Sequence, residues 1–222
     1  MFKKIIIAAI SASFVASAAF ADSTNIGVRI SAANLEASGT ETTDQATTIT
    51  QASKNADFAL PSIFIERSID VNSEVSISLG LDYVPLTAEI SAINSGTGVD
   101  ADIKAGNLVT AYIQPSYLVQ ENVRVFGKLG YAQGDLEVDN ITRTANLDGE
   151  TAPTDTGADK TLEGAVYGVG IQVDRDGGVF NFIRLEATHT DFDKVSHTNS
   201  NGKVLTADAD MDLVTLTIGK SF

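Results

Sequence analysis

Hydrophobic and polar residues alternate with a strict two-residue period at the end of the chain, within residues 210–222. In an extended strand Val214, Leu216 and Ile218 would point to one side, and the small polar residues between them to the other. A two-residue period is typical of a β-strand and not of a helix. The stretch ends on the aromatic residue Phe222. We therefore predict a C-terminal strand that is apolar on one face and polar on the other.

The same alternation recurs in seven earlier segments, so that the pattern predicts eight strands. In each of them one face carries mostly large apolar residues, and the opposite face carries glycine, serine, threonine or charged residues. The predicted strands are residues 25–33, 57–68, 74–84, 107–119, 123–132, 161–173, 179–189 and 210–222.

The segments between these strands alternate between long and short. The long polar segments are residues 34–56, 85–106, 133–160 and 190–209, and the short turns are residues 69–73, 120–122 and 174–178. In an antiparallel barrel all the long connections then lie at one end and all the short ones at the other. This arrangement is typical of outer-membrane barrels, which have short periplasmic turns and long extracellular loops. We therefore predict an all-β protein, an eight-stranded antiparallel transmembrane β-barrel formed by residues 22–222.

Charged and bulky side chains fall on the face that is predicted to line the barrel interior. A charge on the lipid face would be costly, whereas inside a narrow barrel opposite charges can pair. The predicted interior cluster comprises Arg29, Glu66, Asp82, Lys128, Arg184 and Glu186. The aromatic residues on the same face are Phe64, Tyr112, Phe126, Phe180 and Phe182. An eight-stranded barrel has an interior that side chains just fill, so we expect a closed interior and not an open pore.

The N-terminal segment has the composition of a secretory signal peptide. Lys3 and Lys4 precede an apolar run, and Ala19-Phe20-Ala21 provides the small residues of a cleavage site. The alternative, a membrane helix anchor, is disfavoured because the run is short and interrupted by serine. We predict that residues 1–21 are removed after export.

Composition excludes several classes of function. The chain contains no cysteine, which excludes disulfides and thiolate metal sites. Its formal net charge is −14, and loss of Lys3 and Lys4 with the signal would lower it to −16. Such a charge disfavours nucleic acid as a partner. The acidic residues are concentrated in the long polar segments, where they are expected to be solvated.

Several features together resemble a known family. The signal peptide, the eight alternating segments, Lys128-Leu129-Gly130-Tyr131, Arg184-Leu185-Glu186 and the terminal Phe222 are similar to the small outer-membrane β-barrel proteins. That family includes the membrane domain of outer-membrane protein A, the outer-membrane protein X type and the opacity or surface-antigen barrels. The resemblance implies residence in the outer membrane of a Gram-negative bacterium and a role in envelope integrity or adhesion. It implies contact with outer-membrane lipid and lipopolysaccharide.

The same resemblance implies how the chain is assembled. Phe222 would be the assembly signal through which periplasmic chaperones and the barrel-assembly machinery recognise the protein. We expect no cofactor and no catalytic site, and we expect the loops to bind an extracellular ligand.

Two other functions remain open from the sequence. One is a narrow pore or small-solute channel, which the bulky inward residues disfavour. The other is a lipid-modifying outer-membrane enzyme, which would need a base and a nucleophile close together. The only histidines are His189 and His197, and His189, near Asp191 and Ser196, is the candidate base.

A calcium site is a weak further candidate. Asp208, Asp210 and Asp212 alternate along one strand face, and Asp191 and Asp193 lie in the same predicted loop. Clustered carboxylate oxygens suit Ca²⁺, but the segment lacks the glycine and the spacing of a calcium-binding loop.

Overall fold

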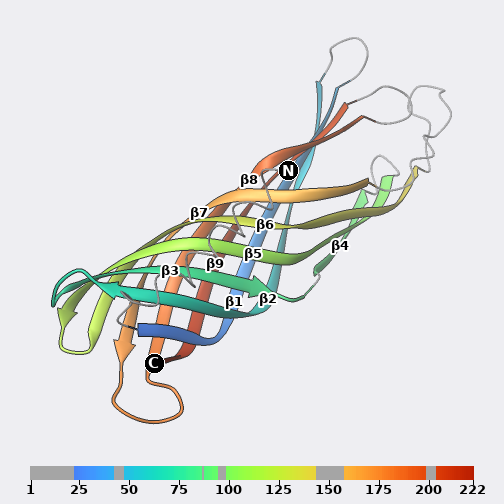
Figure 1. Ribbon diagram of the computed structural model, residues 1–222. Coiled ribbons are helices and arrows are strands. Elements are labelled where there is room, and N and C mark those ends of the chain that lie inside the picture. The colour runs from blue at the N-terminus through green and yellow to red at the C-terminus, as the bar shows by residue number, and fades with distance from the viewer. Residues whose placement is uncertain (1–22, 43–47, 87, 95–98, 144–157, 199–203) are drawn as a thin grey trace.

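The computed structural model describes residues 23–42, 48–86, 88–94, 99–143, 158–198 and 204–222. These residues form one antiparallel sheet that curls into an elongated barrel (Figure 1). Its strands are β1 (Ser23–Thr42), β2 (Thr48–Asp70), β3 (Val75–Val84), β4 (Ala88–Asn94), β5 (Val99–Gln120), β6 (Val123–Arg143), β7 (Ala158–Asp174), β8 (Phe182–Thr198) and β9 (Val204–Ser221). The predicted signal peptide, residues 1–21, lies outside the described residues.

The sheet closes because β3 pairs with β2 on one side and with β5 on the other. β4 pairs with the part of β5 that precedes the segment paired with β3, so β3 and β4 together fill one strand position. The first and last strands meet along β1 and β9. At this seam Thr24 and Phe222 exchange two backbone hydrogen bonds of 3.0 and 2.9 Å. The predicted closed, eight-stranded antiparallel barrel is confirmed.

The predicted division of the strands into two faces is also correct. Along the barrel wall, large apolar residues are exposed on the outside, whereas polar and charged residues are buried inside. For example, Ile63 and Leu185 are 55% and 52% exposed, while Glu66 and Arg184 are 0% and 2% exposed. Within the described residues, no helix has both the length and the hydropathy needed to cross a membrane.

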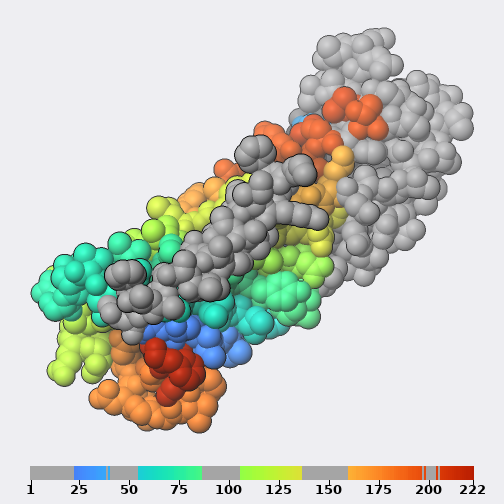
Figure 2. Space-filling view, viewed as in Figure 1, coloured from blue at the N-terminus to red at the C-terminus, as the bar shows by residue number. Residues whose placement is uncertain are grey.

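The two ends of the barrel differ in how the strands are connected. Short turns join β2 to β3, β5 to β6 and β7 to β8 at one end, which we call the turn end. Figures 1 and 2 show the C-terminus at this same end, beside the β7–β8 turn. The turns have the expected chemistry: Asn122 has a positive φ of 66°, and Gly177 and Gly178 have φ of 72° and 95°. The opposite end is called the loop end.

At the loop end the strands are much longer than predicted. Residues 34–42 and 48–56, expected to form one long loop, continue β1 and β2 as a paired ladder. β4, the first part of β5 and the last part of β6 likewise occupy segments that were predicted to be loops. The predictions failed here because they required apolar residues on the outer face. Beyond the apolar band the outer face is polar, and the apolar residues, such as Leu35 and Phe58, lie on the inner face.

One predicted interior aromatic residue lies elsewhere. Phe180 was placed in a strand beginning at residue 179, but β8 begins at Phe182 and Phe180 is 50% exposed. The two positive-φ glycines turn the chain at residues 177–178. A backbone hydrogen bond of 2.8 Å from Arg175 N to Asn181 O then closes a wider turn that includes Phe180.

Between the barrel wall and the loop end, the sheet separates into two halves. β7 and β8 pair only as far as Gly164 and Phe192, although each strand continues beside its other neighbour. β2 and β3 likewise pair only from Ile63 toward the turn end. The extension therefore consists of two four-stranded groups, β2-β1-β9-β8 and β7-β6-β5-β4, which diverge in Figure 1.

Candidate functional site

The six charged residues predicted to line the interior are brought together in the barrel. Arg29 pairs with Asp82 and, at 3.0 Å, with Glu186. Lys128 donates to both carboxylate oxygens of Glu186, at 2.6 and 2.7 Å. On the opposite side Arg184 donates to both oxygens of Glu66, one of them at 2.9 Å. We call these six residues the ionic cluster.

Neutral polar groups complete the hydrogen bonding of Glu66. Asn25 Nδ2 donates to one of its oxygens at 2.8 Å, and the hydroxyl of Tyr112 donates to the other at 3.0 Å. A carboxylate that is fully removed from solvent needs such partners, because an unpaired buried charge is strongly destabilising. Glu66 is therefore fixed by three different strands, β1, β5 and β8.

Aromatic rings enclose the cations of the ionic cluster. The Arg184 guanidinium lies 4.7 Å from the centroid of Phe182, and Lys128 Nζ lies 4.4 Å from that of Tyr112. Arg29 lies 5.1 Å from the centroid of Phe64. Cations attract the faces of aromatic rings, most strongly where water is excluded. The sequence indicated that these rings fill the interior but gave no signal that they stack on the cations.

Inward glycines create the space that these rings occupy. A Cβ atom at Gly80 would collide with the ring of Tyr112, and one at Gly219 would collide with the ring of Phe182. These glycines and rings lie on different strands, so each pair fixes the distance between two parts of the wall. The ionic cluster and its rings thus form a packed layer across the barrel.

Nearer the loop end, an apolar layer crosses the barrel interior. Its buried members are Ala33, Leu60, Ala132, Val166, Phe192 and Met211. This layer was not predicted, because its residues lie in or near segments that were expected to form loops. A signal was present: on β9 the apolar residues change from outward positions at Val214 and Leu216 to inward positions at Met211 and Leu213.

The outer face at the loop end is acidic. Glu36, Asp210 and Asp191 are directly opposite one another on the neighbouring strands β1, β9 and β8. Glu36 and Asp191 are exposed and Asp210 is half-buried. Like charges in directly opposed positions destabilise a sheet, so this arrangement has an energetic cost within the protein itself.

The weak calcium prediction is not supported. Asp208 forms an ion pair of 3.0 Å with Lys194, and Asp212 Oδ1 lies 2.7 Å from His189 Nδ1. The aspartates therefore turn to separate partners instead of converging. Within the residues that the structure describes, no three acidic or histidine side chains are arranged to hold a metal ion.

The candidate base, His189, is on the outer face of β8 at the upper edge of the apolar band. Its ring packs on Tyr167, with the centroids 5.0 Å apart, and its other described contact is Asp212. Ser196, considered as a neighbouring hydroxyl, instead lies 3.3 Å from the hydroxyl of Thr206. The structure therefore forms a histidine–carboxylate pair without the expected serine. His197 lies in β8, and its side chain is outside the described residues.

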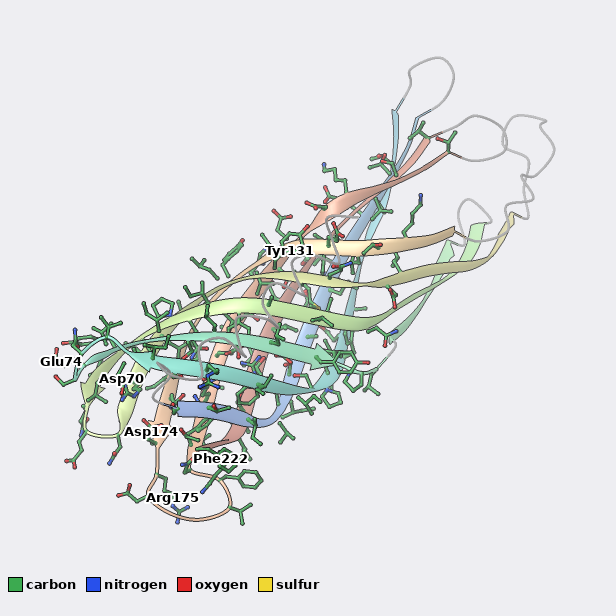
Figure 3. All side chains as sticks on the ribbon, viewed as in Figure 1. Asp70, Glu74, Tyr131, Asp174, Arg175 and Phe222 are labelled. Carbon is green, nitrogen blue, oxygen red and sulfur yellow. The ribbon has the colours of Figure 1, made fainter. Side chains whose placement is uncertain are left out.

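Aromatic side chains mark both edges of the apolar band. Toward the loop end the hydroxyl of Tyr83 donates to Asn107 at 3.2 Å, and that of Tyr131 donates to Glu163 at 3.3 Å. Toward the turn end Tyr117 donates to Glu74 at 3.1 Å, and the Phe222 ring is exposed. Figure 3 shows Tyr131 far from the turn end, where Glu74 and Phe222 lie. Tyrosines with apolar bodies and hydrated hydroxyl groups are typical of membrane interfaces.

A family model described as the outer membrane protein beta-barrel domain matches residues 6–219 of the chain. A search of curated proteins finds no match. Solved structures that resemble the chain include Ail, the attachment invasion locus protein of Yersinia pestis, in complex with the heparin analogue sucrose octasulfate. The identity to Ail is 14%, with 90% of this chain and 99% of Ail covered and a TM-score of 0.43.

Two further structures show comparable similarity. Neisserial surface protein A is 9% identical over 87% of this chain and 97% of its own, with a TM-score of 0.41. The N-terminal β-barrel domain of Pseudomonas aeruginosa OprF is 10% identical over 88% and 97%, with a TM-score of 0.34.

Proposed function

Because the chain belongs to the outer membrane protein beta-barrel domain family, we propose that it is a non-catalytic barrel that binds a partner outside the cell through its loop end. Membership of this family places the protein in the outer membrane of a Gram-negative bacterium. The observation that carries the proposal is the long extension, in which paired strands present an acidic outer face above the apolar band.

The orientation of the barrel is part of the proposal. The turn end faces the periplasm and the loop end faces the outside, as in other outer-membrane barrels. We also propose that residues 1–21 are cleaved and that Phe222 is the assembly signal. Phe222 is 71% exposed at the turn end, although its backbone is hydrogen-bonded to Thr24. The ring is therefore not needed to fill the barrel interior, which leaves it free to serve recognition during assembly.

A pore function is less well supported. The ionic cluster and the apolar layer cross the interior at two successive levels, and every member except Asp82 is buried. Ions would have to displace paired charges at the first level and enter an apolar layer at the second, which is costly. We expect no steady single-channel conductance from the folded protein in planar bilayers.

An enzymatic function is also less well supported. Hydrolysis or acyl transfer needs a nucleophile within reach of the base. The described contacts of His189 are a carboxylate and an aromatic ring, and its Nδ1 is occupied by Asp212. This arrangement positions the imidazole at the membrane edge but does not place a serine or threonine hydroxyl against it.

The charge and the strand edges of the extension indicate what kind of partner it fits. The formal net charge is −14, and the Glu36–Asp210–Asp191 row concentrates carboxylates on one surface. Among the described pairings, β2 has no neighbour on its β3 side before Ile63, and Pro61 lies in this free edge. Proline is tolerated at a sheet edge, where no ladder hydrogen bond is lost. A basic protein with an extended segment would match both the charge and the free edge.

The proposal is tested by binding of a fluorescent oligolysine peptide to the full barrel in nanodiscs. We expect the triple variant Glu36→Gln, Asp191→Asn, Asp210→Asn to bind about tenfold more weakly, because three attractive charges are removed. The matched control removes three carboxylates at the turn end, Glu74→Gln, Glu121→Gln, Asp176→Asn, and should bind as the wild type does. Equal loss in both variants would mean that only net charge matters, and would overturn the proposed surface.

A further inference from the structure

At the turn end, hydrogen bonds fasten the β7–β8 turn to the last residues of the chain. Asn181 makes three of them: its backbone N donates to Gly219 O at 3.0 Å, its Nδ2 donates to Ser221 O at 3.3 Å, and its Oδ1 accepts from Ser221 N at 2.7 Å. Lys220 Nζ adds a fourth bond, to Gly178 O at 3.0 Å. The turn and the end of β9 are therefore held in a fixed arrangement.

This arrangement, residues 175–181 and 219–222, is called the turn–terminus unit, and it exposes three large apolar side chains. Val179, Phe180 and Phe222 are 79%, 50% and 71% exposed. The hydrogen bonds described above hold Phe222 close to the other two, and Figure 2 shows the C-terminal residues at the surface against the β7–β8 turn. Apolar side chains gathered at a surface mark a contact with a protein or with a membrane.

The other two short turns have a different composition. They are Val71-Asn72-Ser73-Glu74 between β2 and β3, and Glu121-Asn122 between β5 and β6. Neither carries an aromatic residue, and each contains a glutamate. The acidic residue of the β7–β8 turn, Asp176, lines the polar mouth of the barrel interior. Among the three turns, only the β7–β8 turn therefore presents an aromatic side chain.

Two cations lie on the outer face beside the turn–terminus unit. Lys220 is directly opposite Ile26, which is exposed on the outer face of β1. Arg67 is directly opposite Thr24, and Thr24 in turn exchanges two backbone hydrogen bonds with Phe222. Directly opposed residues share one face of a sheet, so both cations face outward near the end of the apolar band.

Neither cation is neutralised within the part of the chain that the structure describes. Ion pairs are made by Arg29, Arg124 and Arg184 on the inner face, whereas no carboxylate of a described residue pairs with Arg67 or Lys220. Lys220 gives one hydrogen bond to a carbonyl oxygen and has two further donors. Both cations are therefore available to an anion that lies outside the barrel.

We propose that the turn–terminus unit anchors the barrel in the headgroup layer of the membrane, where its apolar side chains enter the lipid and Lys220 and Arg67 bind phospholipid phosphates. Lys220 and Phe222 continue the outward row of Leu216 and Ile218, so the unit is continuous with the lipid-facing band. Aromatic groups beside cations with long apolar stems suit such an interface. That the leaflet is periplasmic rests on the orientation given under the proposed function, whereas the anchor does not.

The absence of tryptophan from the sequence allows a direct test by single-tryptophan fluorescence. Phe180→Trp reports on the turn–terminus unit. The matched control is Val71→Trp, because Val71 is an apolar residue that is 58% exposed in the β2–β3 turn. Both variants are folded into phosphatidylcholine vesicles that contain a lipid brominated near the headgroup, and heat-modifiable migration checks folding. Both leaflets have the same composition, so the orientation of the barrel does not affect the result.

We expect the brominated lipid to quench Phe180→Trp at least about threefold more strongly than Val71→Trp, because only the former lies at the membrane interface. Acrylamide, which quenches from water, should show the opposite order. Equal quenching of the two variants by lipid would overturn an anchor specific to this turn. Quenching of Phe180→Trp by acrylamide but not by lipid would also overturn it, and would leave the apolar surface to a protein partner.

Phosphate binding is tested by comparing brominated phosphatidylglycerol with brominated phosphatidylcholine, whose choline offsets the phosphate charge. Phosphatidylglycerol should be enriched around Phe180→Trp by about two- to fivefold, because basic residues attract anionic lipids. Lys220→Gln with Arg67→Gln should remove this preference. Arg124→Gln with Lys194→Gln, which removes two cations elsewhere, should retain it. A preference that is absent from the start, or that survives the first double substitution, would overturn the phosphate contacts. None of these results depends on whether the loop end binds oligolysine.

Discussion

The barrel wall and the extension beyond it are made of the same strands, but they are built in opposite ways. In the wall the outward residues are apolar and the inward ones are polar or charged. In the extension Asp57 and Asp212 lie on the outer face, while Leu60 and Met211 lie inside. On β9 both faces change over between residues 211 and 215, within one strand and without a break in the ladder.

The difference teaches that the surroundings of the outer face determine which residues it carries. In lipid there is no hydrophobic gain from burying apolar side chains inside, and polar groups must find internal partners. In water the usual gain from burying apolar area returns. The strand ladder itself is indifferent to this change, because its backbone hydrogen bonds are made in either medium. The apolar layer is where the interior of the barrel changes from one rule to the other.

The largest effect is expected from breaking the buried ion pair in the wall. Arg184→Leu leaves Glu66, which is 0% exposed, without its cation. Loss of one partner of a buried pair typically costs about 3–5 kcal/mol. Urea unfolding in lipid vesicles measures this cost.

The matched control is Arg124→Leu, which removes an ion pair at the turn end with Asp174. Its side chains are 24% and 32% exposed. A solvent-accessible pair contributes about 0–1 kcal/mol, so this variant should unfold almost as the wild type does. If the two arginine variants lost equal stability, the ionic cluster would not have the structural role given to it here.

The next effect sharpens the boundary on the outer face of β9. Leu216→Arg places a charge in the apolar band, where an arginine costs about 2–4 kcal/mol near the middle of the bilayer. Asp212→Arg introduces an arginine on the same face of β9, four positions closer to the loop end. There it meets polar neighbours and should change the free energy of unfolding by less than about 1 kcal/mol. Equal losses would place the membrane boundary elsewhere.

A smaller effect is expected inside the extension. Met211→Ala removes most of a side chain that is 4% exposed in the apolar layer. Such truncations cost about 2–5 kcal/mol in a closed core, and the low end, about 2, is expected in a layer close to the open loop end. Amide hydrogen exchange should accelerate in residues 190–198 of β8 and 204–213 of β9, which form the extension, and should remain slow around the ionic cluster. Uniform acceleration would show that the wall and the extension unfold as one unit.

The wall could be predicted from the sequence, whereas the extension could not. In the wall a single rule, apolar outside, applies to every strand, and it correctly assigned Arg29, Lys128 and Glu186 to the interior. In the extension the rule reverses, and alternation such as Asn34-Leu35-Glu36 is short and weakly apolar. It therefore looked like a polar loop. The prediction that Phe180 lies in a strand was wrong for a local reason, because the path of the chain before β8 depends on two glycines with positive φ.

The partners within the interior could not be predicted either. Alternation gives the face on which a residue lies but not its height relative to residues on other strands, which depends on the stagger of the barrel. Glu66 and Arg184 are separated by 118 residues and meet only because of that stagger.

The smallest predicted effect concerns the cost of the acidic surface. Asp210 lies directly between Glu36 and Asp191, so Asp210→Asn removes two like-charge contacts. We expect the variant to be more stable than the wild type by about 0.2–1 kcal/mol in dilute buffer. The gain should disappear in about 1 M salt, where charges are screened beyond ~3 Å.

The control is Asp212→Asn, on the same face of β9. Asp212 lies 2.7 Å from His189 and is not part of the row of three carboxylates, so its substitution removes no like-charge contact and should give no gain. A gain that persists in salt would mean that the row is not electrostatically strained, and that the surface is acidic at no cost to the fold.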